Sequence, residues 1–149
     1  MKKTDIAYIA GLFDGEGCIR INKNSAQHRY YSLNISVKMS WQWMPEFLRC
    51  GFGGSVYKYK MDKYYPNAKD QWCWNIRGQQ AVEFLETVMP YLKLKRAEAE
   101  LALLFQSKKL SKADYLGKTH KGKRIRTDEE LAVEEAQYIL MKGLKKSEA

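Results

Sequence analysis

The part of this sequence best suited to chemistry is a short stretch in which two acidic residues stand among glycines, Ile9-Ala10-Gly11-Leu12-Phe13-Asp14-Gly15-Glu16-Gly17. Ala7, Gly11 and Gly15 are spaced four residues apart, so in a helix they lie on one face. Small residues on that face allow two copies of the helix to approach closely. Glu16 would then lie beside the Glu16 of the second copy, and two neighbouring carboxylates need a cation between them. The stretch therefore predicts a magnesium site in which carboxylate and backbone oxygens are the ligands.

Residues 4–13 are expected to form the helix that positions this stretch, because their apolar side chains recur at helical spacing. Gly15 or Gly17 can end the helix. Two strands are predicted after it, over residues 18–24 and 30–38, since apolar and polar residues alternate in both. These two strands are expected to form a hairpin.

The same order of elements is expected again in the second half of the chain. The predicted elements are a helix over 43–50, strands over 55–61 and 71–77, and a helix over 81–89. After a stop at Pro90, a further helix is expected over residues 92–110. A last helix is predicted to run to about Leu144 from the capping box Thr127-Asp128-Glu129-Glu130.

The expected strands each have one apolar and one polar face, which fits an α+β fold with an antiparallel sheet and helices on a single face. In the strand over 55–61, Tyr57, Tyr59 and Met61 are assigned to the apolar face. The polar faces lack acidic residues, whereas an ordinary solvated face would carry more of them. Their side chains are of the types that bind base edges and phosphates. We therefore predict that the following residues contact DNA: Arg20, Asn22, Ser32, Asn34, Ser36, Lys38, Lys58, Lys60, Gln71, Asn75 and Arg77.

The charge balance of the chain favours a polyanionic partner. The sequence has 26 Lys and Arg against 17 Asp and Glu, a formal net charge of +9 and a pI near 9.4. Within the basic segment 108–126, we expect Lys121, Lys123 and Arg124 to bind DNA irrespective of its sequence. No apolar run approaches the ~20 residues that span a bilayer. We expect no membrane partner, no signal peptide and an intracellular location, in a bacterial or phage cytoplasm or in an organelle matrix.

Other classes of chemistry have few residues to use in this chain. The three cysteines, Cys18, Cys50 and Cys73, are widely spaced and lack a Cys-x-x-Cys pair, so structural disulfides and zinc are not expected. The two histidines, His28 and His120, lie in polar neighbourhoods without ligand-type partners. Nucleases with a His general base and Ser-His or Cys-His hydrolases are therefore not expected.

The stretch 9–17 resembles the signature of the LAGLIDADG homing endonucleases, and the order of elements resembles that family's αββαββα core. The segment Leu92-Lys93-Leu94-Lys95 is similar to the basic segment after the family's third helix. The resemblance covers most of residues 5–105. It implies a saddle-shaped antiparallel sheet, with helices on one face and extra C-terminal helices. It also implies one domain over residues 1–149, in which the basic loop and last helix occupy about 108–145.

The resemblance also implies roles for residues of the motif. Glu16 is the expected catalytic metal ligand, with the backbone carbonyl of Gly15 as a supporting ligand, although the family more often has Asp in place of Glu16. Lys95 matches the basic residue that lies near the scissile phosphate in the family, where it would stabilise the charge of the transition state or help to activate water.

Two further expectations concern the dimer and the attacking water. Ala7, Gly11 and Asp14 are expected to form the dimer interface, with Asp14 tying the two motif helices together. Near the end of its second strand the family often has a polar residue, commonly Gln, that holds the water, and this chain has Met39 there. Ser40 or Gln42 is expected to take that role.

The resemblance implies an intron-encoded type of site-specific endonuclease that cuts double-stranded DNA. Because the chain has a single motif, it would act as a homodimer on a long pseudo-palindromic target. The implied cofactor is Mg²⁺, for which Ca²⁺ or Mn²⁺ can substitute. Metal-activated water would attack phosphorus in line, with a second metal at the leaving oxygen.

Two alternatives use the same sheet for another purpose. One is an RNA-binding maturase that helps an intron to fold, and the other is a LAGLIDADG-type regulator that binds DNA without cutting. Glu16 and Lys95 favour the nuclease, whereas Met39 favours the alternatives.

Overall fold

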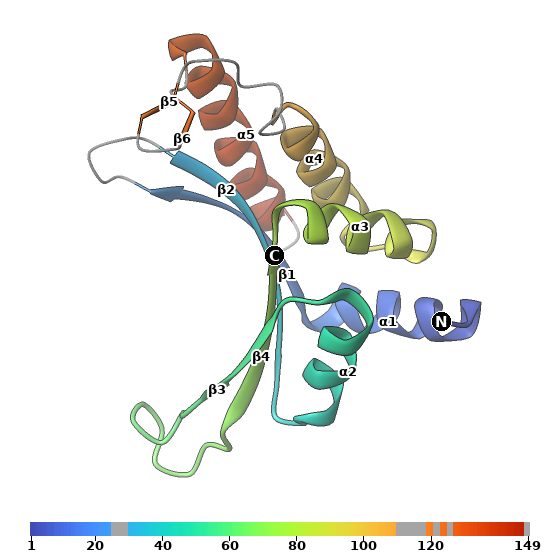
Figure 1. Cartoon of the computed structure of the whole chain (residues 1–149). Coiled ribbons are helices and arrows are strands. Elements are labelled where there is room, and N and C mark those ends of the chain that lie inside the picture. Colours follow the sequence, from blue (N-terminus) through green and yellow to red (C-terminus); the bar gives the residue numbers. More distant parts are fainter. Residues whose placement is uncertain (25–29, 110–118, 121–122, 125–126, 148–149) are drawn as a thin grey trace.

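Four antiparallel strands form one curved sheet, and the helices lie on one side of it (Figure 1). The computed structural model describes residues 1–24, 30–109, 119–120, 123–124 and 127–147. Its elements are α1 (Lys3–Glu16), β1 (Gly17–Asn24), β2 (Tyr30–Met39), α2 (Trp43–Phe52), β3 (Ser55–Tyr59), β4 (Gln71–Arg77), α3 (Gly78–Val88), the 3₁₀ turn η1 (Met89–Tyr91), α4 (Arg96–Ser107), the short strands β5 (Thr119–His120) and β6 (Lys123–Arg124), and α5 (Asp128–Ser147). The predicted α+β fold and αββαββα order are confirmed. No helix in the described part of the chain is long and apolar enough to span a membrane.

Helix α1 passes into strand β1 without a loop. At its start, the backbone N–H of Lys2 donates to the Asp5 carboxylate at 3.1 Å, so α1 begins earlier than the apolar pattern suggests. At its end, a Cβ on Gly17 would lie 2.1 Å from the Phe13 ring. Only glycine fits this approach, and the strand therefore starts directly after Glu16.

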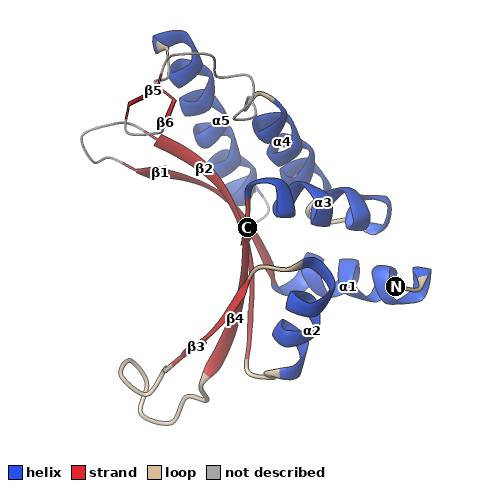
Figure 2. Ribbon diagram, viewed as in Figure 1, coloured by secondary structure: helices blue, strands red, loops and turns tan. Residues whose placement is uncertain are grey.

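The sheet has the strand order β1-β2-β4-β3, so the two hairpins join through β2 and β4 (Figure 2). The alternation predicted for β1, β2 and β4 is confirmed on the side that the helices cover. The residues buried there are Ile19, Ile21, Tyr31, Leu33, Ile35, Val37, Trp74 and Ile76. The opposite side, which none of the described helices covers, is called the open face below, and it lies on the inside of the sheet's curve (Figure 1).

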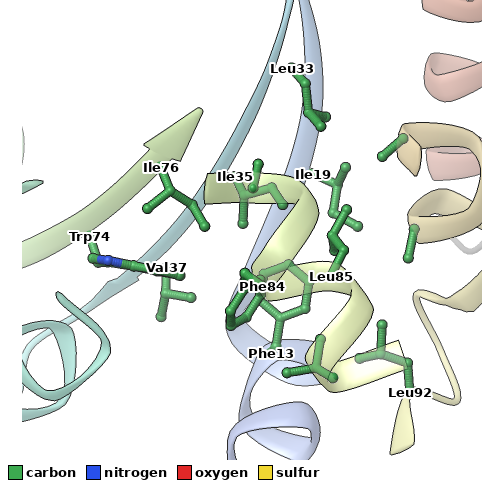
Figure 3. Close-up of a cluster of buried hydrophobic side chains, with 14 of the residues drawn as sticks. Phe13, Ile19, Leu33, Ile35, Val37, Trp74, Ile76, Phe84, Leu85 and Leu92 are labelled. Atoms are coloured by element: carbon green, nitrogen blue, oxygen red, sulfur yellow. The ribbon is translucent and has the colours of Figure 1, made fainter. Parts of the chain in front are cut away.

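An aromatic cluster joins the helices to the sheet at the centre of the core (Figure 3). Phe84 of α3 makes edge-to-face contacts with Phe13, Trp74 and Phe52, at centroid distances of 5.0, 5.1 and 4.9 Å respectively. Each such pair contributes about 0.5–1.5 kcal/mol beyond the burial of its area. The buried Trp74 indole N–H donates to the carbonyl of Gly53 at 2.8 Å. These contacts hold α1, and with it the motif, at a defined position against the sheet.

The faces predicted for β3 are wrong. Val56 pairs with Trp74 and Lys58 with Trp72, and residues paired across antiparallel strands share a face. Val56 packs against the core, whereas Tyr57 and Tyr59 are exposed on the open face. Because β3 is an edge strand, its amphipathic tyrosines can remain in water while Val56 is covered.

Several element boundaries also differ from the predictions. Strand β3 ends at Tyr59 rather than at residue 61, and the helix expected from residue 92 begins at Arg96. The capping box at Thr127 is confirmed, since its hydroxyl accepts from the Glu130 amide at 3.2 Å and its amide donates to the Glu130 carboxylate at 3.0 Å.

Candidate functional site

The end of α1 places an exposed carboxylate beside the last backbone carbonyls of the helix. Glu16 is the last residue of the helix, and its side chain is exposed. The Gly17 N–H bonds the carbonyl of Phe13, so the carbonyls of Gly15 and Glu16 follow the last intrahelical bond. Gly15 has no side chain to cover its carbonyl, and a Cβ there would meet nothing within 4 Å. Carboxylate and carbonyl oxygens are the donors that Mg²⁺ and Ca²⁺ prefer, so this end of the helix suits such an ion.

Asp14 connects the end of α1 with the segment between η1 and α4. One carboxylate oxygen accepts from the Lys93 amide at 2.9 Å, and the other accepts from the Lys95 amide at 3.0 Å. The Lys95 Nζ donates to the Asp14 carbonyl at 2.7 Å. These three bonds hold the segment in a non-helical conformation, which explains why α4 begins at Arg96.

The Lys95 ammonium group therefore lies beside the last turn of α1. Its partner there, Asp14, is two residues before Glu16. The side chain of Lys95 is half-buried, and the bond to the Asp14 carbonyl fixes where its ammonium group points. The sequence predicted that Asp14 ties together two copies of α1. The structure gives both Asp14 oxygens partners within the same chain, so Asp14 positions Lys95, and its role between two copies of α1 stays a prediction.

Replacing Asp14 by alanine is expected to lower the free energy of unfolding by about 1.5–3 kcal/mol, because two amides lose a charged acceptor. The expected loss is that of one such bond, since water can replace the acceptor at the amide of the exposed Lys93. Urea denaturation measures the change. Asp62→Asn, on an exposed loop, is the matched control and should stay within about 0.5 kcal/mol. An unchanged Asp14→Ala midpoint would show that the two bonds to the Asp14 carboxylate do not stabilise the fold.

The face of α1 that carries the small residues is open. Gly11 is exposed, and a Cβ at this position would meet nothing within 4 Å. Ala7 is half-buried on the same side of the helix. This arrangement leaves room for a second helix against α1.

The residues expected to hold the attacking water are not joined to the site by the described hydrogen bonds. Met39 packs against the core, as expected for a residue two positions after Val37 in the same strand. Gln42 precedes α2 and is exposed, with no described hydrogen bond to Glu16 or Lys95. Ser40 follows β2 directly and is half-buried. A role for Gln42 therefore stays a prediction.

The open face of the sheet carries no acidic residue on its four strands. The predicted contact residues differ in how accessible they are on this face. Arg20, Asn22, Lys38 and Arg77 are exposed, and Ser32, Gln71 and Asn75 are half-buried. Asn34 and Ser36 are 4% and 8% exposed, and the Asn34 amide donates to Asn75 at 2.7 Å. The four exposed residues are thus best placed to contact a ligand, and the half-buried ones follow.

Two predicted contact residues lie elsewhere. Lys58 is on the helix-covered side of β3, where its Nζ lies 5.5 Å from the Trp72 ring centroid and 3.1 Å from the Asp70 carboxylate. Its assignment to the polar face is therefore wrong. Lys60 is exposed but follows the end of β3, so it lies beyond the strand rather than on its face.

The strand β3 instead presents tyrosines to the open face, which the sequence interpretation missed. Tyr57 and Asn75 line a cavity of about 500 Å³ together with Ser55 and Arg77. A side-chain hydrogen bond with Cys73 raises the pKa of the Tyr57 hydroxyl, and burial adds a smaller effect in the same direction. This hydroxyl therefore stays neutral and able to donate. Lys38 lies 4.2 Å from the Tyr59 ring centroid. The β-branched Val56 just before the tyrosines was the signal for the correct face.

Some predicted residues fall where side chains are not described. Lys121 lies outside the described residues. Lys123 and Arg124 form β6, and only their backbone is described. Within the described residues of one chain, no three His, Cys, Asp or Glu side chains gather as a metal-binding group.

Comparison with known proteins identifies the fold. No protein-family model matches the chain, and no curated protein is similar in sequence. Among solved structures, the homing endonuclease I-CvuI with its target in the presence of Ca is 21% identical, with a TM-score of 0.73 over 95% of this chain and 82% of that one. The homing endonuclease I-TnaI is 18% identical, with a TM-score of 0.59 over 97% of each chain. The LAGLIDADG homing endonuclease I-GzeII with its DNA target is 14% identical, with a TM-score of 0.58 over 91% of this chain and 43% of that one. The chain thus has the fold of LAGLIDADG homing endonucleases.

Proposed function

We propose that this chain is a site-specific endonuclease that cuts double-stranded DNA as a homodimer with a divalent metal. The observation that carries the proposal is the placement of Glu16, the Gly15 carbonyl and Lys95 together at the end of α1. The three bonds of Asp14 hold this arrangement. The arrangement lies on helix α1, whose small-residue face leaves room for a second copy of the helix. Structural neighbours with the same fold, such as I-CvuI and I-GzeII, contain bound DNA targets.

The open face supplies the DNA-binding surface in this proposal. It is free of acids, and its exposed arginines, lysine and asparagine can bond base edges and phosphates. Two copies related by a two-fold axis would present the same strands to both halves of a duplex, so the target is expected to be pseudo-palindromic.

Different residues of the chain would bind the metal and the phosphate at the cleavage site. Glu16 and the Gly15 carbonyl would hold a divalent cation, Mg²⁺ first, with Ca²⁺ or Mn²⁺ as substitutes. When bound, the cation supplies Lewis-acid stabilisation of the phosphate's charge and a more acidic water. Lys95 would place its ammonium group against the scissile phosphate and stabilise the charge that develops there. A single α1 carries half of this arrangement, so each cut requires the pair.

Neither alternative gains support from the structure. Met39 had favoured a binding-only regulator or an RNA maturase, because it replaces a polar residue. Its side chain packs on the core side of β2, so packing explains an apolar residue at this position. The nuclease remains the function that the site supports best.

The proposal is tested with a supercoiled plasmid that carries the sequence flanking this chain's own gene, joined without the gene. We expect linear plasmid in Mg²⁺ and intact plasmid in EDTA. Intact plasmid in Mg²⁺, despite tight binding of the protein to the same fragment, would support the regulator instead. Preferential binding to the transcript of that region would support the maturase.

In the same assay, Lys95→Ala is expected to slow cleavage by about a hundred-fold or more, with little change in affinity, since one transition-state contact is typically worth about 2.7–4 kcal/mol. Lys93→Ala is the matched control, because the side chain of this exposed neighbour has no described partner and only its amide bonds Asp14. Single-turnover rates at saturating protein separate the chemical step from binding. Equal rates for Lys95→Ala and the parent would assign Lys95 to the solvated surface.

A further inference from the structure

A second basic surface lies where α5 packs beside the edge strand β1. A cavity of about 530 Å³ opens there, lined on the strand side by Arg20 and Lys23 and on the helix side by Lys142 and Lys145. The remaining lining residues are neutral, namely Ile21, Asn22, Tyr138 and Met141. The cavity therefore gathers four cations from two elements more than a hundred residues apart in the sequence, without an acid among its lining residues.

Three of these cations keep their charge available. Lys23 is neutralised by Glu135 of α5 at 2.9 Å. Arg20 and Lys145 both approach the sulfur of Cys18, at 3.1 and 3.3 Å, and a thiol is a weak acceptor that does not neutralise them.

The third available cation, Lys142, lies 4.5 Å from the Tyr138 ring centroid, a contact that orients an ammonium group without pairing it with an anion. None of the described ion pairs includes Arg20, Lys142 or Lys145.

The helix dipole alone does not account for this arrangement. Lysines near the C-terminal end of a helix are stabilised by its dipole, and this applies to Lys145 and Lys146 of α5. Lys146 is exposed and does not line the cavity. Lys145 instead turns toward β1, where it shares Cys18 with Arg20. The shared contact places helix and strand cations around one space.

The cavity adjoins the open face. Arg20 and Cys18 lie on that face of β1, since they pair with Asn34 and Ser36. Because β1 is the edge of the sheet, the lysines of α5 extend the basic surface beyond that edge. A duplex on the open face would present one of its sugar-phosphate backbones along such an edge.

We propose that Arg20, Lys142 and Lys145 form a site beside β1 that binds phosphates of the DNA backbone. This inference rests on the proposed function, in that it takes duplex DNA as the ligand of the open face. Contacts with phosphates add affinity without reading sequence and release condensed counterions. The site would therefore set the protein's register on the duplex, while other residues of the open face read the bases.

The test compares the parent with the double variant Lys142→Gln/Lys145→Gln in binding a mixed-sequence DNA duplex without metal, by fluorescence anisotropy across a salt series. Loss of two phosphate contacts lowers the slope of log affinity against log salt by about 1.8. The ratio of parent to variant affinity is then about twelve times larger at about 50 mM than at about 200 mM salt. Lys146→Gln removes one charge from the same helix at an exposed residue outside the cavity, and it should keep nearly the whole parent slope.

Two outcomes would overturn the inference. One is a Lys146→Gln variant that loses half or more of the slope that the double variant loses, because this would make the effect one of net charge alone. The other is a larger loss with single-stranded RNA than with the duplex, which would identify another ligand. The assay needs no cleavage, so failure of the plasmid test leaves this result readable, and an unchanged slope leaves the nuclease proposal standing.

Discussion

Glu16→Gln is expected to abolish cleavage while leaving binding to DNA nearly unchanged. Glutamine keeps the size of the side chain but removes the charge that would hold the cation. The cation's Lewis-acid contribution is worth several kcal/mol, and about 4 kcal/mol corresponds to a thousand-fold in rate. We therefore expect at least about a thousand-fold slower linearisation of the plasmid. Affinity for the same fragment in Ca²⁺ should change by less than a few-fold, because the variant keeps the whole open face.

A loss of folding is not expected to interfere with this comparison. Glu16 is exposed at the end of α1 and has no described hydrogen bond or ion pair. Glu86→Gln, an exposed position on α3, is the matched control and should cut at the parent rate. A Glu16→Gln protein that binds and cuts like the control would place the chemistry elsewhere in the chain.

Gly11→Leu is expected to give a folded protein that neither dimerises nor cuts. The distance between two packed helices depends on the side chains at their contact, and leucine would hold two copies of α1 apart. Within one chain, the same substitution meets open space, since a Cβ on Gly11 has nothing within 4 Å. Leucine also has a higher helix propensity than glycine by about 0.5–1 kcal/mol. The monomer should therefore be at least as stable as the parent monomer.

Light scattering and the plasmid assay on the same preparation decide this prediction. Gly143→Leu is a matched control, because Gly143 is an exposed glycine of helix α5 that also has open space around a Cβ. We expect the control to remain dimeric and active. A Gly11→Leu monomer that still cuts both strands would show that neither pairing through α1 nor two copies of Glu16 is needed.

The sequence alone determined the order of the elements and the inner face of three strands. In β1, β2 and β4 the apolar residues alternate strictly, because each strand has one face against the helices. The start of α5 was also predictable, since Thr127 and Glu130 satisfy each other's backbone groups within four residues. Such signals are local, so they do not depend on partners that are distant in the sequence. The roles predicted for Glu16, Gly15 and Lys95 followed instead from the resemblance of the motif and of residues 92–95 to the LAGLIDADG family.

Only the tertiary structure decided the placement of features that depend on partners distant in the sequence. Tyr57 and Lys58 exchanged their expected faces because pairing with β4 sets the register of β3. The carboxylate oxygens of Asp14 accept from amides 79 and 81 residues away in the same chain, which no local pattern predicted. The packing of α5 beside β1 brought Lys145 to Cys18 across 127 residues. Burial and charge at these positions come from contacts between elements, and a pattern of neighbours along the chain does not contain them.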